Sequence, residues 1–321
     1  MTDSAHTMSS GPAAPSASPR RAGIDIRRWL TRLSLITSTV ALSACHAALL
    51  DPKGPVGQAE KVLLIDSLAI MLAIVVPTII MCLAVAWWFR ASNKKAVHLP
   101  DWEFSGRVEM VVWGIPLMTI ILLGGVTWIA AHELDPAVPL PSKHEALEVQ
   151  VVSLDWKWLF IYPKQGVAAV NQLTLPAGVP VHFSITSSSV MNTFFVPELG
   201  SMIYSMNGMT TQLNLQADEP GVFHGLSGHY SGEGFADMHF EVHAVPAAEF
   251  ATWVDSTRTN GRSLDTAEYN ELAKQSIAVA PSTYRTVAPD LFQKIVSLEL
   301  APGPGPETAH EGATGKPEIK P

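Results

Sequence analysis

The chain has 321 residues, of which 47% are hydrophobic and 16% are charged, and its formal net charge is −8. Charged residues make up about 25% of an average soluble domain, so this composition indicates large apolar segments. The negative charge excludes a basic footprint for nucleic acid. The two cysteines, Cys45 and Cys82, lie in the first third of the chain, which excludes a disulfide framework and a thiolate metal site from the polar second half.

Residues 1–44 have the composition of a leader. Arginines precede an uncharged stretch at 33–44, which has the form of a secretory signal and is too short to span a bilayer. The segment LSAC at 42–45 resembles the lipobox of bacterial lipoproteins. This resemblance implies cleavage before Cys45 and its acylation. The alternative is an uncleaved anchor with a chance cysteine.

Two apolar stretches follow, and residues 67–89 and 110–131 contain no charged side chain. Each exceeds the roughly 20 residues that a helix needs to cross the hydrocarbon core. The sequence therefore predicts a transmembrane helical hairpin within residues 45–140, with spans at about 65–89 and 109–131.

The charges around these spans predict their orientation. The connecting loop holds four basic residues, which are Arg90, Lys94, Lys95 and Arg107. By the positive-inside rule this loop is cytoplasmic, so Cys45 and the chain after about residue 132 are periplasmic. The lipobox-like segment agrees, because its lipid would lie on the same side.

The composition changes after residue 140. Short β-rich runs are separated by turns rich in Pro and Gly; the runs are 147–154, 158–162, 172–175, 179–186, 210–215 and 238–245. This pattern predicts an all-β sandwich or barrel over residues 141–246. Short helices are predicted at 247–254 and 266–275, within a helical and aromatic-rich C-terminal segment, 247–300. Residues 281–300 are predicted to pack on the β-domain. Residues 301–321 are predicted to be a disordered tail.

Four segments of the chain form a joint signature. They are SLDWKWLFIY at 153–162, SVMNTFFVP at 189–197, GSMIY at 200–204 and DEPG at 218–221. Together they resemble subunit II of the haem–copper respiratory oxidases, over about residues 45–300. The resemblance implies two transmembrane helices followed by a periplasmic cupredoxin-like domain with short C-terminal helices.

Copper-bearing members of that family hold two copper ions with a histidine on an earlier strand and with Cys, Glu, Cys, His and Met in a later loop. The matching positions in this sequence are Asn192, Tyr230, Gly232, Gly234, Met238 and Glu241. Thiolate and imidazole ligands suit such a centre, and neither stands at these positions. A shift by one residue aligns Glu233 and His239 but supplies no cysteine. The pattern therefore resembles the ubiquinol oxidase branch, the cytochrome bo type, which lacks this copper.

The resemblance implies a proton-pumping oxidase of the bacterial inner membrane that oxidises ubiquinol and reduces oxygen to water. It assigns the haems, the copper at the oxygen site and the quinol site to subunit I. No cofactor, no metal and no catalytic residue are therefore expected on this chain. The expected partners are subunit I, the other subunits and membrane lipid, without docking of cytochrome c. The alternatives are subunit II of a cytochrome c oxidase-like complex and a stand-alone, membrane-anchored lipoprotein scaffold. Haem types and the choice between ubiquinol and menaquinol stay open.

Two groups of side chains allow a second interpretation. Trp156 and Trp158 are predicted to alternate on one strand and to fill a core or an interface; the alternative is a pair of electron-transfer steps. Four histidines near the loop are predicted to be surface or hydrogen-bonded residues, and the alternative is a metal site with Glu241. They are His224, His229, His239 and His243.

Overall fold

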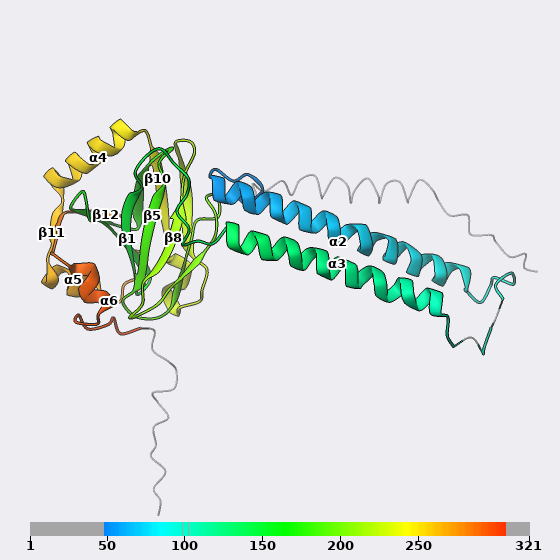
Figure 1. Cartoon of the computed structure of the whole chain (residues 1–321). Coiled ribbons are helices and arrows are strands. Elements are labelled where there is room, and N and C mark those ends of the chain that lie inside the picture. Colours follow the sequence, from blue (N-terminus) through cyan, green and yellow to red (C-terminus); the bar gives the residue numbers. More distant parts are fainter. Residues whose placement is uncertain (1–47, 98, 102, 306–321) are drawn as a thin grey trace, which may run out of the picture. The chain divides into compact units, whose positions relative to one another are not determined.

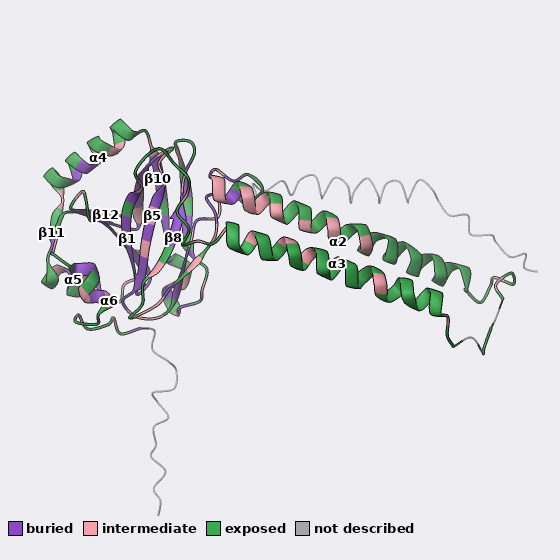
Figure 2. Ribbon diagram, viewed as in Figure 1, coloured by how far each residue is buried: buried purple, intermediate pink, exposed green. Residues whose placement is uncertain are grey.

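The computed structural model describes residues 48–305 except 98 and 102, so the leader and Cys45 lie outside the described residues. After a single turn, η1 (Ala48–Leu50), the chain forms two long helices, α2 (Pro55–Trp88) and α3 (Gly106–Glu133). Both are long and apolar enough to cross a membrane. Their side chains are largely exposed in the isolated chain (Figure 2), as expected for surfaces that face lipid or a partner subunit.

Helix α2 begins about ten residues before the predicted span, because its first turns rest on the β-domain. The backbone N–H of Gly57 donates to the carbonyl of Leu199 at 3.1 Å, and that of Lys53 donates to the carbonyl of Glu198 at 2.7 Å. A Cβ built on Gly54 would lie 2.1 Å from the carbonyl oxygen of Gln216. The start of α2 therefore needs a residue without a side chain at position 54.

The β-domain has two sheets, with strand orders β11-β12-β3-β2-β1-β5-β8 and β4-β10-β9-β6-β7 (Figure 1). The strands are β1 (Leu147–Leu154), β2 (Lys157–Tyr162), β3 (Val167–Val170), β4 (Gln172–Pro176), β5 (Val181–Ser187), β6 (Asn192–Phe195), β7 (Ile203–Ser205), β8 (Thr211–Leu215), β9 (Gly221–Ser227), β10 (His239–Val245), β11 (Arg262–Leu264) and β12 (Ser282–Val287). This is the predicted all-β, cupredoxin-like fold after two apolar helices.

The space between the sheets is filled by aromatic rings. Trp158 and Phe160 of β2 pack against Phe194 of β6 and Phe240 of β10, with ring centroids 5.1 to 6.4 Å apart. The hydroxyl of Tyr162 donates to the carbonyl of Thr174 at 2.8 Å, and burial raises the pKa of this phenol. The two sheets are thus joined by packing and by a buried hydrogen bond.

A second core covers the opposite face of the seven-stranded sheet. Leu159 and Ile161 of β2 pack with residues of the C-terminal segment, including Tyr269, Phe292 and Ile295. Every residue of β2 is therefore buried, and alternate side chains point into the two cores. This double burial explains why β2 is a continuous apolar run rather than an alternating one.

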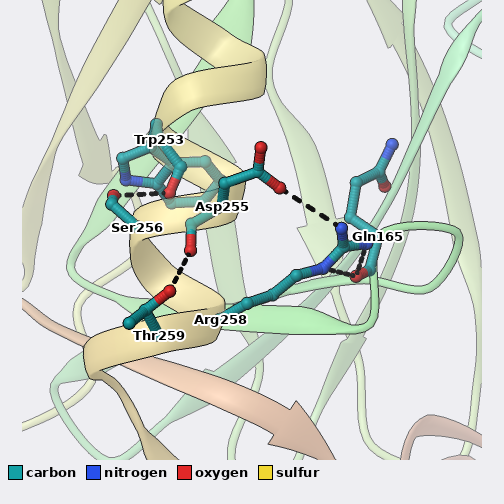
Figure 3. A network of polar contacts seen from close by, with 6 residues as sticks. All are labelled: Gln165, Trp253, Asp255, Ser256, Arg258 and Thr259. Carbon is teal, nitrogen blue, oxygen red and sulfur yellow. Dashed lines mark hydrogen bonds and ion pairs between the residues drawn. The ribbon is translucent and has the colours of Figure 1, made fainter.

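The C-terminal segment contains the helices α4 (Ala247–Asn260), α5 (Thr266–Leu272) and α6 (Leu291–Val296). Asp265 caps α5, because its carboxylate accepts from the backbone N–H of Glu268 at 2.8 Å. In α4 the guanidinium of Arg258 donates twice to the backbone carbonyl of Gln165, at 2.7 and 3.2 Å (Figure 3). Arg258 thereby fixes the helix to the turn between β2 and β3.

Two predictions for this part of the chain need correction. The segment 247–300 is not only helical and aromatic, since β11 and β12 extend the seven-stranded sheet. Residues 301–305 are not a disordered tail but lie against the β-domain, where the N–H of Gly303 donates to the carbonyl of Ser188 at 2.8 Å. We call residues 301–305 the C-terminal strap; residues 306–321 lie outside the described residues.

Candidate functional site

The loop at 228–238 joins β9 to β10 and contains the short helical turn η2 (Glu233–Asp237). It carries four of the six positions that match copper ligands. Tyr230 is 73% exposed and its ring contacts that of Phe235 at 5.5 Å, so its side chain points outward. Gly232 has φ of +104°, a conformation that residues with a side chain rarely adopt, and Gly234 is buried.

Trp156 lies directly against this loop. A Cβ built on Gly234 would lie 2.5 Å from the Trp156 ring, and the indole Nε1 donates to the carbonyl of Ser231 at 2.9 Å. The prediction that Trp156 lies on a strand is wrong. Trp156 occupies the turn between β1 and β2 with φ of +62°, because the chain reverses there. Trp158 is on β2 and is fully buried among aromatic rings of the core.

The remaining matching positions have other partners. Asn192 of β6 is 1% exposed, and its carbonyl oxygen accepts from the hydroxyl of Ser227 at 3.1 Å. The buried thioether of Met238 accepts from the hydroxyl of Ser231 at 3.9 Å. Glu241 points to the outer face of β10, where its carboxylate lies 2.9 Å from Nε2 of His243. Of the four side chains at the six matching positions, those of Tyr230 and Glu241 therefore point outward, whereas those of Asn192 and Met238 are buried.

Three of the four histidines near the loop lie around Glu241 on the outer face of β9 and β10, and the fourth lies elsewhere. His239 and His243 share the outer face of β10, and His224 lies opposite Glu241 on β9. His229 instead packs edge-on against Tyr204, with centroids 6.0 Å apart. Within residues 48–305, leaving aside 98 and 102, no three His, Cys, Asp or Glu side chains are grouped so that they could hold a metal ion.

Comparison with known proteins identifies the two parts of the β-domain. Residues 147–245 match the family model of the cytochrome c oxidase subunit II periplasmic domain, and residues 258–298 match the aromatic-rich motif of the same oxidases. The cytochrome bo(3) ubiquinol oxidase subunit 2 of Pseudomonas aeruginosa is 46% identical over 88% of this chain and 84% of its own length. The chain belongs to the ubiquinol oxidase subunit 2 family.

Other relatives span most of the chain as well. Ubiquinol oxidase subunit 2 of Acetobacter aceti is 46% identical over 84% of this chain and 88% of its own length. Quinol oxidase subunit 2 of Bacillus cereus is 36% identical over 72% of this chain and 79% of its own length. Two membrane-spanning helices followed by a periplasmic domain fit an inner-membrane respiratory subunit.

The wider oxidase subunit II family implies a binuclear copper centre, and the residues at its positions do not fit one. Such a centre needs thiolate bridges and imidazole ligands. The positions hold two glycines, an outward tyrosine, a hydrogen-bonded asparagine, a single thioether and a carboxylate on the outer face. Cys82, the one cysteine among the described residues, lies in α2 rather than in the periplasmic domain.

Two polar residues beside Trp156 were not predicted from the sequence to be important. The carboxylate of Asp155, 3% exposed, accepts from the hydroxyl of Ser189. The buried Nζ of Lys157 donates to the carbonyl of Lys274 at 2.6 Å and to Ser276, and burial lowers the pKa of this amine to about 8. The signal was present in the quoted segment 153–162, where two charged residues alternate with aromatic ones.

Proposed function

We propose that this chain is the non-catalytic subunit II of a proton-pumping quinol oxidase that reduces oxygen to water. The observation that carries the proposal is the donor set at the six copper positions, which contains no thiolate and no imidazole. A water-soluble cytochrome c needs a relay to reach a haem inside the membrane, and the copper pair is that relay in the wider family. A quinol dissolves in the bilayer and reaches the membrane subunit directly.

The haems, the oxygen-site copper and the quinol site belong to subunit I in this proposal. The chain then contributes two helices that brace subunit I and a periplasmic domain that covers it. The surfaces of α2 and α3 are available for such packing, because the side chains of both helices are largely exposed. The relatives at 46% identity are named ubiquinol oxidases, which favours ubiquinol over menaquinol as the donor.

Turnover of the purified complex tests the electron donor. We expect rapid oxygen consumption with a soluble ubiquinol and none above background with reduced cytochrome c. Copper analysis of the same preparation should find only the copper of subunit I, without absorption from thiolate-bound copper. Turnover with cytochrome c, or a thiolate–copper band, would overturn the proposal. Purification of this chain without a haem-containing subunit would instead support the lipoprotein-scaffold alternative.

We also propose that Cys45 is the mature N-terminus and carries the lipid. Leu49 and Leu50, which follow it closely, are about half exposed, as is suitable for a segment at the outer membrane surface. Mass spectrometry of the mature chain should show a diacylglyceryl group and an amide-linked acyl chain on Cys45. An unmodified chain that retains residues 1–44 would contradict this.

A further inference from the structure

The buried carboxylate of Asp155 binds the end of the described chain. Its Oδ2 accepts from the backbone N–H of Gly305 at 3.0 Å, and its Oδ1 accepts from the hydroxyl of Ser189. A carboxylate that is 3% exposed requires such donors, because an unpaired buried charge is costly. One acidic residue therefore joins the β1–β2 turn to a segment 150 residues further along the chain.

The C-terminal strap is held at two further points. The N–H of Gly303 donates to the carbonyl of Ser188, and the side-chain amide of Gln275 donates to the carbonyl of Gly305. Gly305 has φ of +70°, and a Cβ there would approach Val190 to 3.2 Å. The strap is therefore seated by several hydrogen bonds and by a conformation that favours glycine.

Lys157 binds the segment that contains Gln275. Its Nζ donates to the carbonyl of Lys274 and to the hydroxyl of Ser276, the two neighbours of Gln275. Asp155 thus holds the strap directly, and Lys157 holds the segment that carries the second contact to it. The contacts of these two residues form a ring that runs through Gly305 and Gln275.

Trp156, between these two residues, points the other way. Its indole donates to the carbonyl of Ser231 and packs on Gly234, both in the loop at 228–238. Its φ of +62° is uncommon for a residue with a side chain and persists only where surrounding contacts hold it. The contacts that hold the turn on its other side are those of Asp155 and Lys157 with the C-terminal segment.

We propose that the C-terminal strap positions the loop at 228–238, acting through Asp155 and the indole of Trp156. Asp155 is in this sense a positioning residue. The strap fixes the turn, the turn fixes the indole, and the indole fixes the loop. The proposal goes beyond the oxidase function and does not depend on the identity of the electron donor.

Amide hydrogen exchange of the full-length chain in detergent tests the proposal. The informative amides are those of Phe235 and Met238, which donate within the loop to the carbonyls of Gly232 and Phe235. Ending the chain after Leu300 removes the strap, and we expect exchange at these amides to accelerate roughly tenfold. Ending it after Pro306 keeps the strap and is the matched control, with no change expected. Unchanged loop exchange in the shorter chain would overturn the proposal.

Two substitutions separate positioning from a general loss of stability. Asp155→Asn keeps the size of the side chain but offers only one accepting oxygen, so it should accelerate loop exchange in the same direction as removing the strap. Trp156→Phe keeps an aromatic ring but loses the donor to Ser231. In the Trp156→Phe chain, removing the strap should have no further effect on the loop. An equal acceleration with and without the indole would show that the strap does not act through Trp156.

Discussion

At the scale of single residues, the positions that match copper ligands make packing contacts and hydrogen bonds within the domain. Gly234 lets the Trp156 ring approach the loop backbone. The side-chain oxygen of Asn192 accepts a hydrogen bond from the hydroxyl of Ser227. Met238 keeps a soft sulfur, but it is buried within the domain core. Contacts within the chain therefore account for the shape of the loop at these positions.

Lys157 gives the β-domain a predictable response to pH. Its pKa is about 8 in the folded chain against 10.5 for an ordinary lysine, because burial disfavours the ammonium form. Between these values the unfolded chain binds a proton that the folded chain does not, so stability rises with pH. We expect a gain on the order of 1 kcal/mol from pH 8 to 10, allowing for solvent screening, measured by thermal unfolding in detergent.

The substitution Lys157→Met should remove this rise, since methionine does not titrate. Lys164→Met is the control: Lys164 is half exposed and paired with Glu145, which raises its pKa. The rise between pH 8 and 10 should persist in that variant. A flat profile in the unmodified chain, or a rise that survives in Lys157→Met, would contradict the assignment.

At the scale of elements, the sequence predicted what periodicity and length determine. Apolar pattern and turn residues predicted the two spans and strand β1 with its observed bounds. They also predicted most of β5. Strand β9 is absent from the predicted runs, because Gly225 interrupts its β-rich pattern. The glycine is needed there because the Phe240 ring would lie 2.1 Å from a Cβ. The local sequence around Gly225 does not indicate that an aromatic ring from another strand packs against it.

The turn and the strap were missed for a related reason. Trp156 has high strand propensity, and its left-handed conformation is stabilised by contacts with residues distant in sequence, including Ser231 and Gly234. The strap has the Pro- and Gly-rich composition of a disordered tail, yet Asp155 binds it. The lack of any thiolate ligand in residues 141–246, by contrast, could be read from the sequence, because it depends on residue identity alone.

The joint between α2 and the β-domain can be tested at position 54. Gly54→Ala places a methyl group against the Gln216 carbonyl and should lift the start of α2 from the domain, at a cost of roughly 1–3 kcal/mol. Gly54 itself is extended, so alanine adds no backbone strain there. Limited proteolysis near residues 51–54 and thermal unfolding measure the effect.

Gly124→Ala is the matched control for that change. Apart from the adjacent backbone of α3 itself, no atom lies within 4 Å of a Cβ built on Gly124, so the isolated chain should tolerate alanine. Equal protease sensitivity of the two variants would mean that the close contact at Gln216 does not hold the helix. Increased cleavage in Gly54→Ala alone would locate the joint at the start of α2.

At the scale of the whole molecule, the chain divides its apolar residues between two environments. The domain buries its own in two cores on either side of the seven-stranded sheet. The helices expose theirs, as expected for surfaces that face lipid or other subunits of an oxidase complex. The charges of the loop after α2 then decide which side of the membrane holds the β-domain.

This orientation predicts opposite labelling of two engineered cysteines. In a Cys82→Ala background, Lys143→Cys lies in an exposed segment just before β1, and Ala91→Cys lies in the exposed loop after α2. A maleimide that does not cross membranes should label Lys143→Cys in intact spheroplasts, because the β-domain is periplasmic. It should label Ala91→Cys only after the membrane is opened, since basic loops stay in the cytoplasm. The reverse pattern would place the domain in the cytoplasm and exclude an acylated Cys45 on the same side as the β-domain.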